Sequence, residues 1–131
     1  MINKTFLLIM FLTVLSLSIS GCHNSSIKKI ENTTKIVIGY DINSYIAIIR
    51  DKQEIKQLED LFNNAEFTKS DTDIQMPYLR ISFSGKSGSR SFHIDKDDII
   101  QLYKSGNCIK SRQITFDKLY SIFNEYSTNK K

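Results

Sequence analysis

The sequence lacks the patterns that identify several large protein classes. It has no internal repeat and no second block of distinct composition, and it is 131 residues long. These properties predict a single domain with one modest hydrophobic core. The formal net charge is +4, and no basic stripe with interleaved aromatic residues occurs. We therefore do not expect a nucleic acid as partner.

Motifs for phosphate or calcium binding are also missing. Gly85-Lys86-Ser87 ends like a phosphate-binding loop, but Arg80 occupies the position of that motif's first glycine. The segment also joins two expected strands, so we interpret it as a hairpin loop. A calcium loop that begins at Asp95 would need a glycine and a glutamate where Ile100 and Gly106 stand.

A catalytic site would have to be built from His93, Asp95 and Cys108. Alternate residues of a strand share a face, which makes His93 and Asp95 a candidate acid–base pair. Cys108 is a candidate nucleophile with His93 as its base. No serine in an elbow motif accompanies them, and two ligands are too few for zinc. We therefore expect His93 to be an exposed strand residue, Cys108 to be a small buried hydrophobe, and no metal or cofactor.

An apolar run near the start is the most informative feature that is present. Lys4 supplies one positive charge, and the run Phe6–Leu17 is almost entirely apolar. Small residues follow it, as at a signal-peptide cleavage site. The stretch Ile19-Ser20-Gly21-Cys22 resembles the lipobox of bacterial lipoproteins. That resemblance implies attachment of diacylglycerol to Cys22 and cleavage before it. The alternatives are an ordinary signal peptide and a transmembrane helix, for which the run is short.

The lipobox divides the chain into four expected parts. Residues 1–21 are the signal peptide, 22–34 a lipidated polar tether, 35–126 a single domain and 127–131 a polar tail. Cleavage removes one charged residue, Lys4, and leaves 17 basic against 14 acidic residues, a net charge of +3. The lipid on Cys22 leaves Cys108 without a partner for an internal disulfide. The expected location is the extracytoplasmic face of the cell membrane, or the outer membrane where the source has two.

Hydrophobic periodicity predicts an α+β domain. Asp51 can cap a helix whose apolar face is Ile55, Leu58 and Phe62, and Asn63-Asn64 ends it. Thr115 can cap a final helix. Strands are expected at 36–40, 45–49, 78–84 and 90–94, with a loop at 67–75. Residues 99–103 and 108–109 are a further hairpin, with a short helix at 97–104 as the alternative. The predicted fold is a mostly antiparallel sheet with two amphipathic helices packed on one face.

Two segments of the domain resemble a group of small uncharacterised lipoproteins of Bacillus-type bacteria. They are Asp51-Lys52-Gln53-Glu54-Ile55 and Pro77-Tyr78-Leu79-Arg80-Ile81-Ser82-Phe83. The resemblance covers about half of the mature chain and departs at Ile99–Arg112. It implies an α+β fold and brings no catalytic residue with it.

These observations favour a binding module over an enzyme. A membrane-anchored, monomeric domain would meet a protein, peptide or envelope ligand, for example as an inhibitor or an immunity protein. The alternative is an envelope enzyme with a site near His93, Asp95 and Cys108. Binding is favoured because catalysis needs a constellation of groups that the sequence does not display.

Overall fold

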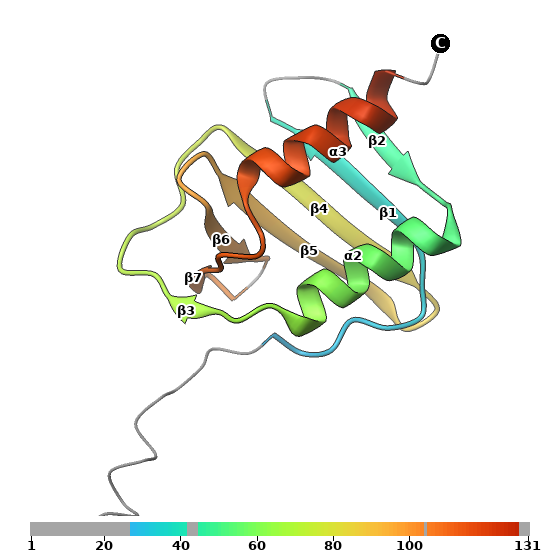
Figure 1. The fold of residues 1–131 in the computed structure, drawn as a ribbon. Helices are drawn as coiled ribbons and strands as arrows, with labels where there is room; N and C mark the ends of the chain where they lie inside the picture. The colour runs from blue at the N-terminus through green and yellow to red at the C-terminus, as the bar shows by residue number, and fades with distance from the viewer. Residues whose placement is uncertain (1–26, 42–44, 104, 129–131) are drawn as a thin grey trace, which may run out of the picture.

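The computed structural model describes residues 27–41, 45–103 and 105–128 (Figure 1). The expected signal peptide and the lipobox with Cys22 lie outside these residues. A seven-stranded antiparallel sheet and two helices form an α+β fold, as predicted. None of the helices in the described part of the chain is long and apolar enough to cross a membrane.

The strands are β1 Thr33–Tyr40, β2 Ile46–Ile49, β3 Thr68–Lys69, β4 Tyr78–Gly85, β5 Gly88–Asp95, β6 Ile99–Leu102 and β7 Cys108–Lys110. They follow the spatial order β2-β1-β4-β5-β6-β7-β3. Strands β6 and β7 pair as the expected hairpin, so the described residues of 97–104 do not form the helix considered as the alternative. The expected loop 67–75 contains one unpredicted strand, β3, which pairs with β7.

Both helices begin at the predicted caps. Helix α2 spans Lys52–Asn64, and Oδ1 of Asp51 accepts the N–H groups of Gln53 and Glu54, each at 3.0 Å. Helix α3 spans Phe116–Thr128, which takes it two residues into the expected tail. Oγ1 of Thr115 accepts the N–H of Lys118 at 3.3 Å.

One face of the sheet and both helices share a single core. Figure 1 shows α2 and α3 lying in front of the sheet. Alternate strand residues are buried on one face because side chains of a strand point to opposite sides. They form one cluster with the buried residues of the helices, Ile55, Leu58, Phe62, Phe116, Leu119 and Phe123. We call the opposite side of the sheet the open face.

Residues 27–34 correct the expected domain boundary at residue 35. Ile30 is only 4% exposed and belongs to the core cluster. The side chain of Asn63 in α2 accepts the N–H of Ile30 at 2.8 Å and donates to its carbonyl oxygen at 2.7 Å. Oε1 of Glu59 accepts the N–H of Thr33 at 2.9 Å. The expected tether is therefore part of the domain from residue 27 onward, because isolated apolar residues and backbone hydrogen bonds hold it there.

Gly85 allows this N-terminal segment to pass over the β4–β5 hairpin. A Cβ atom at position 85 would collide with the carbonyl oxygen of Asn32. Asn32 has φ 58°, a left-handed conformation that asparagine tolerates better than most residues. Thr33 then enters β1 opposite Gly85. Contact between the segment and the hairpin thus requires glycine at this position.

Candidate functional site on the open face of the sheet

A row of side chains crosses the open face from β4 to β7. Strand pairing places Arg80 opposite His93, His93 opposite Gln101, and Gln101 opposite Cys108. All four residues have the strand parity opposite to that of the core, so they share the open face. We call these four residues the polar row. It contains two of the three candidate catalytic residues.

His93 is held as a neutral ring at the centre of this row. Nε of Arg80 donates a hydrogen bond to Nε2 of His93 at 3.1 Å. Because Nε2 accepts this bond, the ring is neutral and carries its proton on Nδ1. The Tyr78 ring stacks on the imidazole with a centroid distance of 4.3 Å and an interplanar angle of 14°. The ring of Tyr103, just after β6, lies with its centroid 6.1 Å from that of the imidazole. His93 is only 7% exposed.

The burial of His93 corrects the expectation that it is an exposed strand residue. Stacked and neighbouring aromatic rings remove water from the imidazole, and burial lowers the pKa of His93 from its ordinary value of 6.5. The positive charge of Arg80 lowers this pKa further, while Asp41 and Gln101 act in the opposite direction. Gln101 lies close enough to exert this effect, yet Nδ1 has no partner within hydrogen-bonding geometry among the described residues.

The carboxylate of Asp95 has a structural role, because it binds backbone N–H groups. Its side chain is 2% exposed and accepts three backbone N–H groups. Oδ2 accepts from Gln75 at 2.9 Å, while Oδ1 accepts from Asp97 at 2.9 Å and from Ile99 at 3.0 Å. These bonds organise the turn between β5 and β6. The carboxylate therefore does not form the candidate acid–base pair with His93, although both residues lie on the open face.

Cys108 is a buried free thiol, 8% exposed. Gln101 lies between it and His93 in the polar row. Two strand spacings separate the backbones of Cys108 and His93, about 10 Å in a regular sheet. A nucleophile and its base need to approach within hydrogen-bonding distance. The structure therefore does not bring Cys108 and His93 together as a catalytic pair, and the thiol is buried as expected.

The open face is hollowed beside Arg80, toward the β2 edge of the sheet. This hollow has a volume of about 320 Å³ and is lined by Arg80, Asp41, Tyr45 and Ile46, among others. Tyr45 is 69% exposed and Ile46 is 50% exposed. The hollow therefore combines one cation, one carboxylate and two exposed apolar surfaces. That composition suits side chains of a partner better than it suits bond-breaking chemistry.

The sequence contains a local signal that identifies Arg80 as a neighbour of His93. Arg80 lies on the polar side of β4, and the hairpin loop fixes the pairing of β4 with β5. Counting the same number of residues back from Lys86 and forward from Ser87 places Arg80 opposite His93. Gln101 lacked such a signal, because its place beside His93 depends on the β5–β6 turn. Within the described residues, no group of three or more histidine, cysteine, aspartate or glutamate side chains is arranged to hold a metal ion.

No protein-family model matches the chain, and neither a curated protein nor a solved structure is significantly similar to it.

Proposed function

We propose that the protein is a membrane-anchored extracytoplasmic lipoprotein that acts as a small, monomeric binding module. Its ligand is a segment of a partner protein or peptide, as for an inhibitor or an immunity protein. The observation that carries this proposal is the contrast between two sets of residues. His93, Asp95 and Cys108 are buried and engaged in packing or structural hydrogen bonds, whereas Arg80, Tyr45 and Ile46 are exposed.

The β2 edge and the Arg80 hollow together favour an extended, acidic segment as ligand. Strand β2 lies at the edge of the sheet and has β1 as its neighbour. An exposed edge strand can accept an added strand through its backbone, with side-chain pockets giving specificity. Natural edge strands are usually blunted by charge, whereas β2 begins with exposed Ile46, and exposed Tyr45 directly precedes it. The Arg80 guanidinium suits a carboxylate of the bound segment.

Capture from envelope extract tests this binding surface. Immobilised wild-type protein should retain a partner that Arg80→Gln and Tyr45→Ala retain several-fold less well. Arg112→Gln and Tyr103→Ala are matched controls, because they change an exposed arginine and an exposed tyrosine outside the hollow. Equal retention by all four variants would place the binding surface elsewhere. Loss of binding or of any activity in a folded His93→Ala protein would instead favour the enzyme alternative.

Metabolic labelling with a fatty-acid probe tests the anchor. The wild-type protein should carry the probe, and Cys22→Ser should lose both the label and cleavage of the precursor. Cys108→Ser is the matched control and should remain labelled. An acyl label that persists in Cys22→Ser would remove the basis of the lipoprotein proposal.

A further inference from the structure

The fold leaves only a short span of chain between Cys22 and the domain. Ile27 packs against the core and Ile30 is buried within it. Residues beyond Ile27 toward the C-terminus are therefore held by the domain rather than extending from it. Five residue steps separate Cys22 from Ile27, and a fully extended chain spans at most about 3.6 Å per step. An acyl anchor at Cys22 would thus hold Ile27 within about 18 Å of the bilayer.

The surface at this end of the domain is basic. Lys28 and Lys29 are exposed, Lys86 is exposed at the tip of the β4–β5 hairpin, and Arg90 is half-buried beside them. We call these four residues the basic edge. Two acidic residues lie close to these four basic ones: Glu31 pairs with Lys29 at 3.6 Å, and Glu59 accepts the N–H of Thr33. A net positive surface therefore lies where the proposed anchor would meet the domain.

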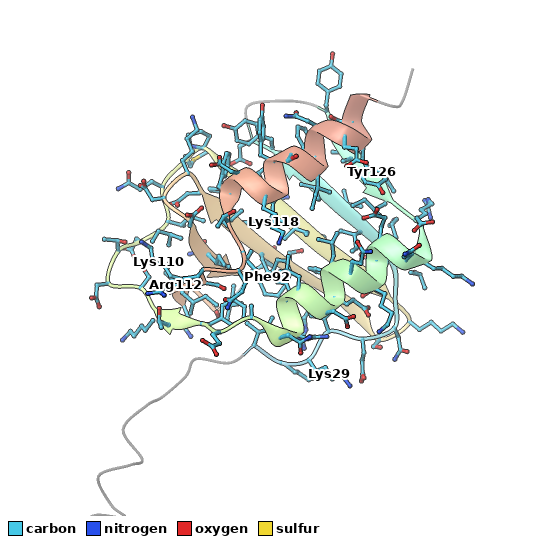
Figure 2. All side chains as sticks on the ribbon, in the orientation of Figure 1. Lys29, Phe92, Lys110, Arg112, Lys118 and Tyr126 are labelled. Atoms are coloured by element: carbon cyan, nitrogen blue, oxygen red, sulfur yellow. The ribbon has the colours of Figure 1, made fainter. Side chains whose placement is uncertain are left out.

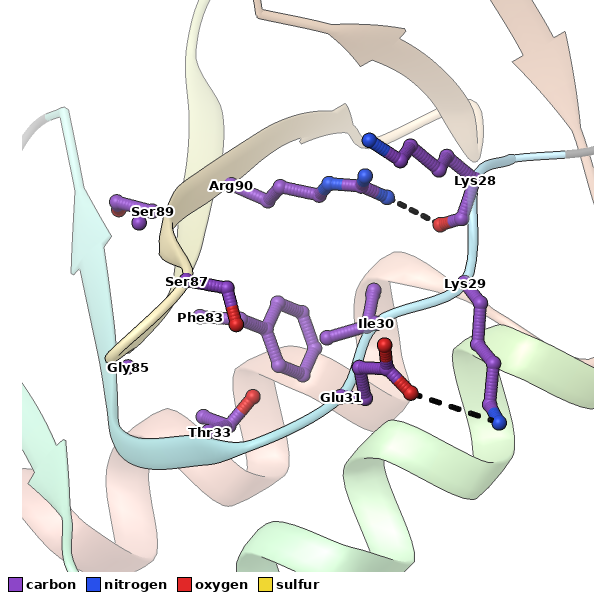
Figure 3. Close-up of a pocket in the computed structure, with 11 residues that line it drawn as sticks. Lys28, Lys29, Ile30, Glu31, Thr33, Phe83, Gly85, Ser87, Ser89 and Arg90 are labelled. Carbon is purple, nitrogen blue, oxygen red and sulfur yellow. Dashed lines mark hydrogen bonds and ion pairs between the residues drawn. The ribbon is translucent and has the colours of Figure 1, made fainter.

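A hollow within the basic edge has room for a headgroup. It has a volume of about 310 Å³ and lies between the N-terminal segment and the hairpin (Figure 3). Arg90 donates to the carbonyl oxygen of Lys28 and so joins the two walls. Ser87 and Ser89 add hydroxyl groups to the lining. Cationic and hydroxyl donors of this kind suit the phosphate of a phospholipid.

We propose that the basic edge is the membrane-facing surface of the domain and binds the headgroups of anionic phospholipids. This inference rests on the proposed lipid anchor for its biological setting. A basic residue near an anionic bilayer is attracted to it, and the attraction falls off within a Debye length. The anchor supplies membrane attachment, while the basic edge sets which side of the domain faces the bilayer.

Vesicle sedimentation separates the basic edge from the anchor. The probe is the processed chain, residues 22–131, with Cys22→Ser, which carries no lipid and contains every residue that the structure describes. It should bind phosphatidylglycerol vesicles more tightly than phosphatidylcholine vesicles, and salt should weaken this binding. Removing three charges by Lys28→Gln, Lys29→Gln and Lys86→Gln should lower binding about tenfold or more.

A matched triple variant removes the same charge from other surfaces. Lys52→Gln, Lys110→Gln and Lys118→Gln change exposed lysines, and Figure 2 shows Lys110 and Lys118 well away from Lys29. This control should retain most of the binding. Equal loss in both triple variants, or equal binding to both kinds of vesicle, would overturn the proposal. Circular dichroism of each variant checks that the comparison is made between folded proteins.

The lipidated protein tests orientation. A fluorophore on Ser87→Cys should be quenched by headgroup-labelled lipid more strongly than one on Ser121→Cys, which lies on the exposed side of α3. Equal quenching would overturn the orientation while leaving the anchor in place. Failure of this protein to associate with phosphatidylcholine vesicles would instead count against the anchor, since the acyl chains need no anionic lipid. The sedimentation result would still test whether the basic edge binds anionic headgroups.

Discussion

The side-chain amide of Asn63 forms two hydrogen bonds with the backbone of Ile30. It donates to the carbonyl oxygen at 2.7 Å and accepts the N–H at 2.8 Å. One side chain near the end of α2 thus satisfies both backbone groups of a residue whose own side chain enters the core. This pairing explains why residues 27–34, most of which are polar, belong to the domain. It also identifies Asn63 as the position at which a substitution tests this contact.

Asn63→Ala should lower the free energy of unfolding by about 1–3 kcal/mol, because it leaves two backbone groups of a buried residue without partners. Asn64→Ala is the control, since Asn64 is exposed in the same turn of α2. Urea unfolding of the two variants provides the measurement. Similar free energies for both would mean that the contact between Asn63 and Ile30 contributes little to stability.

Gly85→Ala should displace the N-terminal segment, because the added methyl group would collide with the carbonyl oxygen of Asn32. Gly39→Ala is the control, since a Cβ there would meet its nearest neighbour, in Ile46, at an ordinary 3.8 Å. We expect faster amide hydrogen exchange at residues 30–33 in Gly85→Ala and little change in Gly39→Ala. Unchanged exchange in both variants would contradict the close packing described here.

Truncation of a core side chain in either helix should lower the stability of the fold. Leu58 is 3% exposed and Phe123 is 2% exposed, so Leu58→Ala and Phe123→Ala should each lower the free energy of unfolding by about 2–5 kcal/mol. Tyr45→Ala removes a side chain that is 69% exposed and should cost much less. Chemical denaturation measures all three. A small cost at Leu58 or Phe123 would show that the corresponding helix is not packed as described.

The stability of the protein should fall as the pH drops below about 6.5. Burial lowers the pKa of His93 in the folded state, so between the folded and unfolded values the unfolded chain binds more protons. The stabilisation is therefore fully present above pH 6.5 and is lost as the pH falls toward the folded pKa. Urea unfolding between pH 7.5 and pH 5 measures this slope.

His93→Gln isolates the histidine in that pH dependence. Glutamine keeps an acceptor for Arg80 but does not titrate, so the difference between wild type and variant cancels the contributions of other groups. We expect the wild type to lose more stability than the variant over this range. Parallel pH profiles would show that protonation of His93 is not coupled to folding.

Local patterns in the sequence predicted much of the fold for physical reasons that the structure makes clear. The Asp51 and Thr115 caps act through bonds to residues two or three positions away, so short-range spacing is sufficient to find them. The β4–β5 hairpin is equally local, because its loop fixes the register. The burial of Asp95 is different, since Gln75 reaches it from a distant loop.

The candidate site and the N-terminal boundary depended on contacts that the sequence does not encode locally. Ile30 stands between polar residues, and its burial requires Asn63 and the hairpin to be in place. The neighbours of His93 in β5, Phe92 and Ile94, belong to the core, so strand alternation predicts that His93 lies exposed on the other face. Its burial comes from Tyr78 on the adjacent strand and from Tyr103, beyond β6. In each case the deciding partner lies far away in the sequence or across a strand pairing whose register was unknown.

The pairing of β1 with β4 also bears on how the chain folds as it is synthesised. Thr33 pairs with Gly85 and Tyr40 with Leu79, so β2, α2 and β3 intervene in the sequence between these two neighbouring strands. Contacts between distant segments form slowly, because the connecting chain must first be closed into a loop. Synthesis proceeds from the N-terminus, so β1 is complete long before β4. Completion of the entire β4 segment is therefore the earliest point at which β1 and β4 can pair.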